Sequence, residues 1–431
     1  MRKIIYIAIS TILFFNSSCS DDKFANSAAT RIQAELENSK KVLCEAENGW
    51  WMQYYATPES PGYSMLMKFE SSELVTIAGR NELTGHSYLE SKSLYNLVAD
   101  YGPVLSFDTY NDILHAFSDP SYPQGSGLMG DYEFIIYHRT ETAFEMAGKK
   151  RNTRILMEKL PVDISWETYF DQLDEMKNIL FGQNPPELTL SLGDNRYVFS
   201  EGKSGIFTIS GTDIPADNLL QVPLITTKTG INLYRPIELA GHTFQKFKLN
   251  EESSALISEN NADVKLNGIS NLTEYFHAEA SKITTTWYID RNNSSADIQE
   301  LCNLIEESLK TRYGNIVSDI YLAINRVTEN QIGFIVHFVL RDTNIYDAKY
   351  SCNWTRLSDT EANLVYNGDS DANGQALYTQ IKGISEFTAL LAEQRSYILS
   401  TTTPINPIKI KLTQKDNPST RIMLSLDKPL N

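Results

Sequence analysis

The sequence is short of cysteine and of positive charge, and each shortage excludes a class of protein. It has 4 cysteines in 431 residues, with no Cys-x-x-Cys pair and no Cys/His cluster, which argues against a structural zinc site. Lysine and arginine together number 38 against 54 aspartates and glutamates, so the formal net charge is −16. Because such a surface repels phosphate backbones, we expect no nucleic-acid partner.

Long apolar runs are also scarce, and the one at the N-terminus predicts export. Arg2 and Lys3 precede a largely apolar run from Ile4 to Phe15, which is too short for the about 20 residues of a membrane-spanning helix. This pattern is typical of a signal peptide, and small residues then lead to Cys19. We therefore expect residues 1–19 to be a lipoprotein signal peptide that ends at a lipidated Cys19. The alternative is a secreted chain whose Cys19 lies inside a discarded peptide.

The residues after Cys19 predict where the anchored protein resides. Ser20-Asp21-Asp22-Lys23 resembles the acidic tag that directs Bacteroidetes lipoproteins to the outer cell surface. We expect residues 20–27 to be an acidic linker, and the protein to be anchored by lipid in the outer membrane with its body exposed on the cell surface. A periplasm-facing orientation is the alternative.

The remaining cysteines are too few and too far apart to define a disulfide framework. With Cys19 used for lipid, Cys44, Cys302 and Cys352 remain, an odd number. We interpret them as buried free thiols, and a Cys302–Cys352 disulfide stays open as the alternative.

Hydrophobic periodicity predicts an α+β, β-dominated protein of two domains. Alternating apolar residues in short segments indicate antiparallel, lipocalin-like sheets or a partial barrel with a few packing helices. We place the first domain at residues 28–182, with an N-terminal helix over 28–47, and a second β-rich domain at 183–431, with a helix over 296–312. The Ser/Asn-rich residues 250–280 are expected to form a loop.

A helix before the expected domain boundary has both of its end signals. Ser165 is a suitable N-cap, and apolar residues recur at helical spacing from Trp166 to Leu180. Gly182 then favours termination, and Pro185-Pro186 forbids continuation.

Four polar residues between Phe107 and Pro120 are the catalytic and ligand-binding candidates. Asp112 and His115 share a face if this segment is helical, and a carboxylate that holds an imidazole can act as a general base. Asp108 and Asp119 flank them as further ligand-binding candidates. The sequence contains neither His-Glu-x-x-His nor Gly-x-Ser-x-Gly, and the interpretation we prefer is a capped turn with a hydrogen-bonded histidine.

Two further segments offer weaker candidate sites. The tryptophans Trp50 and Trp51 are candidate stacking platforms for a ligand, although a first strand with half of its aromatic residues in the core is the simpler interpretation. Asp369, Asp371 and Asn373 have the spacing of a calcium loop, but the loop lacks its final bidentate glutamate. No cofactor is predicted, and calcium remains an alternative at this loop.

Several stretches carry a resemblance to one family. The chain resembles, over nearly its whole length, a family of Bacteroidetes lipoproteins catalogued as a domain of unknown function (number 4302). The residues that carry the resemblance are Cys19-Ser20-Asp21-Asp22, "GWWMQYY", "GYSMLMKF", "GPVLSFDTYNDILHAFSDP", "GDYEFII" and "NPIKIKL". The stretch "YRPIELAG" is similar to a strand of lipocalin-like surface lipoproteins.

The resemblance implies a location and partners, and it transfers no catalytic residue. It implies a β-rich extracellular lipoprotein, often encoded near an outer-membrane transporter and lid lipoprotein of the starch-utilisation type. We therefore expect a non-catalytic binding or accessory component of a nutrient-uptake system for glycans or peptides. The alternatives are an extracellular hydrolase that uses Asp112 and His115, and a structural spacer.

Overall fold

The computed structural model describes most of the chain after the predicted leader. The described residues are 28–100, 102–120, 127–182, 187–282, 284–314, 317–328, 331–341, 344–392 and 395–428. The predicted signal peptide, Cys19 and the acidic linker lie outside them. None of the helices in the described ranges is long and apolar enough to cross a membrane.

The described residues form a β-dominated α+β protein, which confirms the predicted fold class. All of the strand pairs in the described sheets are antiparallel, and the strands form one nine-stranded sheet and two closed barrels. The chain divides after Phe170 into two compact units, which we call unit 1 and unit 2. The division lies inside helix α3 (Trp166–Leu180), whereas the boundary predicted from sequence follows residue 182.

Unit 1 contains the nine-stranded sheet, in the order β4-β3-β2-β1-β9-β8-β7-β6-β5. The strands are β1 (Trp50–Tyr55), β2 (Gly62–Phe69), β3 (Leu74–Gly79), β4 (Leu89–Leu94), β5 (Asn96–Ala99), β6 (Pro103–Ser106), β7 (Glu133–Arg139), β8 (Ala143–Gly148) and β9 (Arg154–Lys159). The edge strands β4 and β5 are separated by the single residue Tyr95, which spans only a few ångströms. The sheet must therefore curl until its two edges approach each other, which makes it a partial barrel.

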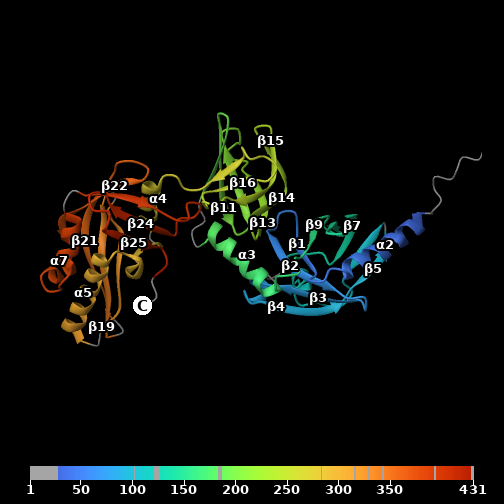
Figure 1. Ribbon diagram of the computed structural model, residues 1–431, viewed down its shortest axis with the longest axis horizontal. Coiled ribbons are helices and arrows are strands. Elements are labelled where there is room, and N and C mark those ends of the chain that lie inside the picture. The colour runs from blue at the N-terminus through green and yellow to red at the C-terminus, as the bar shows by residue number, and fades with distance from the viewer. Residues whose placement is uncertain are drawn as a thin grey trace, which may run out of the picture. The chain divides into compact units, whose positions relative to one another are not determined.

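Helix α2 (Ala28–Cys44) covers part of this sheet. It packs against β2, β5 and β6, and it runs alongside β5 in Figure 1. Val42 and Leu43 of the helix are buried in the core of unit 1. The helix ends at Cys44, three residues before the end predicted from sequence. Gly49, just beyond, has a left-handed φ of 83°, which is incompatible with an α-helix.

The N-terminus of α3 follows the sequence signals. The Ser165 hydroxyl accepts a hydrogen bond from the amide of Thr168 at 3.1 Å, which confirms the predicted N-cap. Gly182 has a φ of 39° immediately after the helix.

Unit 2 contains both closed barrels, where the sequence predicted one β-rich domain. The first barrel consists of β10 (Leu188–Leu192), β11 (Asn195–Lys203), β12 (Ile206–Gly211), β13 (Leu220–Thr227), β14 (Gly230–Leu239), β15 (His242–Leu249), β16 (Ala255–Ser258) and β17 (Lys265–Asn267). Its core also takes Leu180 and Phe181 from the end of α3.

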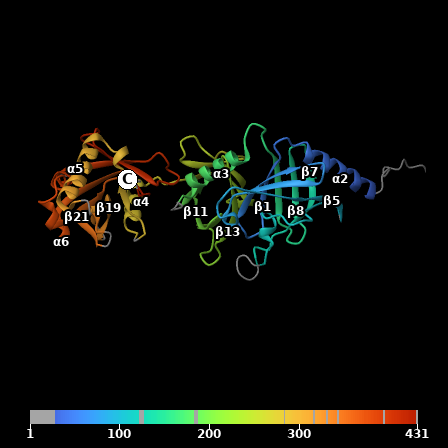
Figure 2. The ribbon, with the colours of Figure 1, turned by 90° about the horizontal axis from the view of Figure 1, so that it is seen from below.

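The second barrel consists of β18 (Trp287–Ile289), β19 (Val317–Thr328), β20 (Gln331–Leu340), β21 (Asn344–Arg356), β22 (Glu361–Ser370), β23 (Ser396–Ser400), β24 (Lys409–Gln414) and β25 (Arg421–Ser425). Its helices are α4 (Leu272–Ala280), α5 (Ala296–Tyr313), α6 (Ala372–Tyr378) and α7 (Ile384–Ala392). Helix α5 packs beside β19 in Figure 2, and its predicted apolar stripe (Ile298, Cys302, Ile305 and Leu309) is buried. The barrel closes through pairing of β18 with β25.

The prediction of a loop over residues 250–280 is wrong. This stretch holds β16, β17 and α4, which are short elements separated by asparagine-based turns. The Asn250 side chain accepts hydrogen bonds from the amides of Ser254 and Ala255, and Asn271 caps α4 by accepting from the amide of Glu274. The asparagines here form turns and a helix cap between ordered elements. The asparagine content of the stretch does not by itself distinguish this arrangement from a loop.

A loop between β23 and β24 completes the core of the first barrel. Ile405 from this loop is fully buried among the side chains of that core. Its amide donates to the carbonyl of Ser253 at 3.1 Å, and a Cβ placed on Gly268 would lie 2.5 Å from the Ile405 Cα. The glycine at 268 therefore permits a close approach of two backbone segments.

Candidate functional site

The segment between β6 and β7 carries the predicted site residues, and a buried asparagine fixes its shape. The Asn111 side chain donates to the Ser91 carbonyl at 3.1 Å and to the Ser93 hydroxyl at 3.2 Å, both on strand β4. Its side-chain oxygen accepts from the amides of Ile113 and Leu114 at 3.1 and 3.2 Å. Asn111 is fully buried, so all four bonds form away from water.

Apolar contacts hold the same segment against the sheet. Ile113, Leu114 and Phe117 are buried in the core of unit 1. The Phe117 ring lies 5.0 Å from that of Tyr54 and 4.6 Å from that of Tyr63, both in edge-to-face geometry. The segment is therefore a fixed part of the scaffold and can hold its exposed side chains in defined positions.

Three aromatic rings follow one another on this segment and the adjoining end of β7. The His115 ring lies 5.3 Å from that of Tyr110 and 4.8 Å from that of Tyr132, at interplanar angles of 32° and 28°. The Lys150 ammonium lies 5.0 Å from the centre of the Tyr132 ring. We call Tyr110, His115 and Tyr132 the Tyr110 stack. Tyr110 is 61% exposed, whereas His115 and Tyr132 are partly buried.

His115 is set up as a neutral, structural imidazole. Its Nδ1 accepts the amide of Asn111 at 3.0 Å, which leaves the ring proton on Nε2. Burial lowers the pKa of His115 below its usual 6.5, against the opposing effect of backbone hydrogen bonds to Phe107 and Asn111.

The carboxylate of Asp112 is bonded elsewhere. Its Oδ2 accepts the Ser91 hydroxyl at 2.8 Å, and its amide donates back to the same hydroxyl at 3.2 Å. Asp112 is exposed and bonds the Ser91 hydroxyl on β4, whereas His115 is held by the backbone amide of Asn111. The arrangement is that of a capped turn with a hydrogen-bonded histidine.

The two flanking aspartates also serve local structure. Asp108 Oδ1 accepts the Ser106 hydroxyl at 2.6 Å. The Asp119 carbonyl lies so close to Gly127, which has a φ of 63°, that a Cβ there would be only 2.3 Å from it. Within the described ranges, no group of three or more His, Cys, Asp or Glu side chains is placed to hold a metal ion.

The tryptophans of β1 are buried in the core and offer no ring face to a ligand. Trp50 is fully buried, donates from Nε1 to the Leu43 carbonyl at 3.0 Å and packs edge-on against Phe144 at 5.0 Å. Trp51 is nearly as buried and donates to the Ser64 hydroxyl at 2.9 Å. All six residues of β1 are buried because the strand lies inside the sheet, between β2 and β9, with both faces covered.

The calcium-like loop begins a helix. Asp371 caps α6, and its Oδ1 accepts the amides of Gly374 at 2.7 Å and Lys349 at 3.1 Å. The side chain of Asn373 donates to the Asp347 carbonyl at 3.0 Å, and Asp369 lies near the end of strand β22. The residue spacing that resembles a calcium loop therefore belongs to the N-cap of α6.

A histidine network on the second barrel was missed by the sequence analysis. His337 Nδ1 lies 2.7 Å from Asp347 Oδ1, and its Nε2 lies 3.8 Å from Asp319 Oδ2. The Tyr321 ring stacks on the imidazole at 4.1 Å and 13°, and Lys428 pairs with Asp319. Because Nε2 faces a carboxylate, the network lacks the nucleophile of a hydrolytic triad. Its residues come from β19, β20, β21 and the segment after β25, so only the pairing of these strands could have revealed it.

The two cysteines of the second barrel are free and buried. Burial raises the pKa of both Cys302 and Cys352 to about 12, so both thiols stay protonated at neutral pH. Cys44 is free and partly buried, 3.4 Å from the Tyr95 hydroxyl.

The fold defines a β-rich protein of antiparallel sheets and barrels, with helices packed on the sheets. Residues 20–251, more than half of the 431, match the family described as "Domain of unknown function (DUF4302)". The chain belongs to this family. No curated protein matches it.

Solved structures give only remote likenesses. A β sliding clamp of C. crescentus aligns with 93% of this chain and 97% of its own, at 8% identity and a TM-score of 0.14. The β chain of DNA polymerase III from Streptococcus pneumoniae TIGR4 aligns with 93% of this chain and 98% of its own, at 10% identity and the same TM-score of 0.14. At that TM-score neither likeness carries an argument about fold or function.

Proposed function

We propose that this protein is a surface-exposed lipoprotein, anchored in the outer membrane through Cys19, that binds nutrient molecules for an uptake system without catalysing a reaction. The observation that carries the proposal is the Tyr110 stack, in which a rigid segment presents an exposed aromatic ring. The leader pattern that ends at Cys19 and the acidic residues after it support the location.

Binding fits this geometry better than hydrolysis does. A general base needs its orienting carboxylate within about 3.2 Å. Here the Asp112 carboxylate bonds the Ser91 hydroxyl, and Nδ1 of His115 already accepts a backbone amide. The same bonds that occupy these groups hold the segment rigid, which lowers the entropic cost of binding a ligand.

The proposed partners are an outer-membrane transporter of the starch-utilisation type and its lid lipoprotein. The test is a pull-down from outer membranes of the native bacterium, solubilised in detergent, with a tagged wild-type protein as bait. We expect the transporter to be recovered with the wild type and lost with Cys19→Ala, which cannot be acylated. Recovery of no transporter component with the wild type would contradict the proposal.

Anchor and orientation are tested separately from partners. Metabolic labelling with palmitate should mark the wild type and leave Cys19→Ala unlabelled. Protease added to intact cells should degrade the wild-type protein if it faces outward. Protection until the outer membrane is broken would instead establish the periplasm-facing orientation.

A hydrolase and a spacer are the outcomes that would replace this proposal. Turnover of a glycan or peptide that His115→Ala abolishes would make the protein an enzyme. A complete absence of ligand-induced stabilisation would favour a spacer, because a ligand that binds only the folded state raises the melting temperature by mass action.

A further inference from the structure

We infer that the Tyr110 stack is a binding site for neutral saccharides, with Tyr110 as the ring on which a sugar stacks. This inference rests on the proposed binding function and names the ligand class and the residue. Four observations support it, namely the exposure of the ring, the charges around it, the adjoining surface of Arg151 and Met129, and the rigidity of its support.

The exposed ring is held for stacking. Tyr110 is 61% exposed although it is aromatic, and His115 lies against it at 5.3 Å. His115 is in turn backed by Tyr132 at 4.8 Å, so the outermost ring cannot fold inward. Aromatic faces carry negative charge density and attract the weakly positive C–H faces of a sugar ring.

The charges around the stack favour a neutral ligand. Asp108 and Asp112, both exposed, lie two residues on either side of Tyr110, and Lys150 and Arg151 lie at the opposite end of the stack. Asp131, beside Tyr132, adds a buried third carboxylate that accepts the amides of Lys150 and Arg151. These five formal charges sum to −1, so an anionic ligand gains no net attraction and a cationic ligand gains a weak one. Carboxylates accept bonds from hydroxyls, and ammonium and guanidinium groups donate to them, which suits a polyol.

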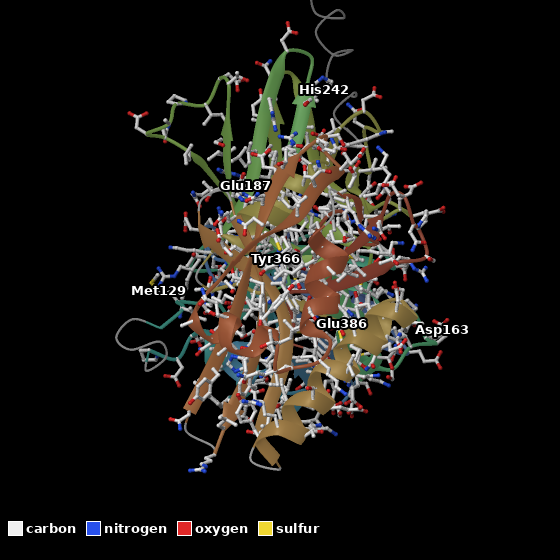
Figure 3. All side chains as sticks on the ribbon, turned by 90° about the vertical axis from the view of Figure 1, so that its left-hand side faces the viewer. Met129, Asp163, Glu187, His242, Tyr366 and Glu386 are labelled. Atoms are coloured by element: carbon white, nitrogen blue, oxygen red, sulfur yellow. The ribbon has the colours of Figure 1, made fainter. Side chains whose placement is uncertain are left out.

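Arg151 and Met129 extend the surface beside the stack. The Arg151 Nε donates to the Met129 carbonyl at 3.3 Å, which holds the base of its side chain. Met129 itself is exposed and points outward from the loop in Figure 3. It adds an apolar contact of the kind that the less polar face of a sugar requires.

The support of the ring is already ordered before any ligand arrives. Asn111, which directly follows Tyr110, makes four buried hydrogen bonds. The hydroxyl oxygen of Thr109, which precedes Tyr110, accepts a hydrogen bond from the Leu94 amide at 2.7 Å. Binding of a ligand would therefore require little further ordering of the protein, so less of the binding free energy would be lost to conformational entropy.

The test measures binding of defined oligosaccharides by isothermal titration calorimetry. The protein is the full-length lipoprotein in a detergent without a sugar headgroup, since a glycosidic detergent would compete. The probes are maltoheptaose, cellohexaose, laminarihexaose and mannohexaose, with oligogalacturonate and oligolysine as charged comparisons. We expect at least one neutral probe to bind, and both charged probes to bind more weakly.

Variants locate the site. Tyr110→Ala should weaken the neutral probe about tenfold, the scale of one lost aromatic contact, and Tyr110→Phe should keep most of the affinity. Tyr137→Ala is the matched control, because Tyr137 on β7 is 65% exposed, and it should bind as the wild type does.

The results that would contradict the inference distinguish the location of the site from the class of ligand. Undiminished binding by Tyr110→Ala, or an equal loss in Tyr137→Ala, would refute the site. Tighter binding of a charged probe through Tyr110 would refute the ligand class. If no neutral probe binds the wild type, the saccharide inference fails, while recovery of the transporter in the pull-down would still uphold the proposed function.

Discussion

Asp112 and His115 are three residues apart, and the structure places them in separate hydrogen-bond networks. Asp112 bonds the Ser91 hydroxyl on strand β4, whereas His115 accepts the amide of Asn111 through Nδ1. The pKa of His115 is accordingly governed by burial and by backbone bonds, and the Asp112 charge is not among its causes.

This separation predicts that Asp112→Asn leaves the titration of His115 nearly unchanged. A carboxylate paired with an imidazole shifts the imidazole pKa by about 1 to 3 units, which such a substitution would remove. The measurement is a pH titration of the His115 ring by NMR in both proteins. A drop of a unit or more in the variant would show that the two residues form a pair.

The burial of neutral His115 predicts a pH dependence of stability. Because its folded-state pKa lies below the usual 6.5, the unfolded chain binds the proton more readily than the folded one. The stabilisation is complete above the unfolded pKa and is lost as the pH falls through it. The free-energy difference between wild type and His115→Ala should therefore shrink between about pH 8 and pH 5, as followed by urea unfolding. A difference that grows with acidity would contradict this prediction.

Asn111 is the residue whose loss should loosen the candidate site most. Asn111→Ala removes four buried hydrogen bonds and leaves two amides without their partner, so we expect a loss of about 2–3 kcal/mol in the unfolding of unit 1. Tryptophan fluorescence in urea reports it. Asn218→Ala, at an exposed position of the first barrel, is the control and should stay within about 0.5 kcal/mol of the wild type. An equal effect of both changes would argue against the anchoring role.

Ile405 should stabilise a barrel to which it does not belong in sequence. Ile405→Ala empties a fully buried position in the core of the first barrel, which costs about 2–5 kcal/mol. We expect hydrogen exchange to rise in β10–β17, although the substitution lies between β23 and β24. Ile398→Ala, on the exposed side of β23, should leave that exchange unchanged. Faster exchange in β18–β25 alone would contradict the prediction.

The three cysteines of the described chain should differ in reactivity. Cys302 and Cys352 are buried thiols with a pKa raised to about 12, whereas Cys44 is partly buried. Because the thiolate is the reactive species, we expect an alkylating reagent at neutral pH to modify Cys44 first and the other two only after unfolding. Peptide mass spectrometry assigns the sites. A recovered Cys302–Cys352 disulfide would contradict the assignment of free thiols.

Local signals predicted the fold class and the three longest of the described helices, because these signals depend on neighbours in the chain. Ser165 and Gly182 mark the ends of α3, and the stripe from Ile298 to Leu309 marks the buried face of α5. The burial of Trp50 and Trp51 needed more than strand periodicity, since it depends on β1 becoming an interior strand of the sheet, between β2 and β9.

The candidate site required contacts between distant segments. Tyr110, Tyr132 and Lys150 come together only because β6, β7 and β8 pair in a given register, which periodicity does not set. The role of Asn111 could not be predicted either. A single asparagine in a polar stretch looks the same in the sequence whether its side chain is exposed or makes four buried hydrogen bonds.

The pairing of β18 with β25 closes the second barrel between the first and the last of its strands in chain order. Until Arg421–Ser425 has been synthesised, β18 and β24 each keep one unpaired backbone edge. A deletion of even this short strand would leave both edges exposed permanently, ready to pair with another molecule. The open barrel therefore offers two edges for self-association until β25 is in place, and a truncation should spare this strand.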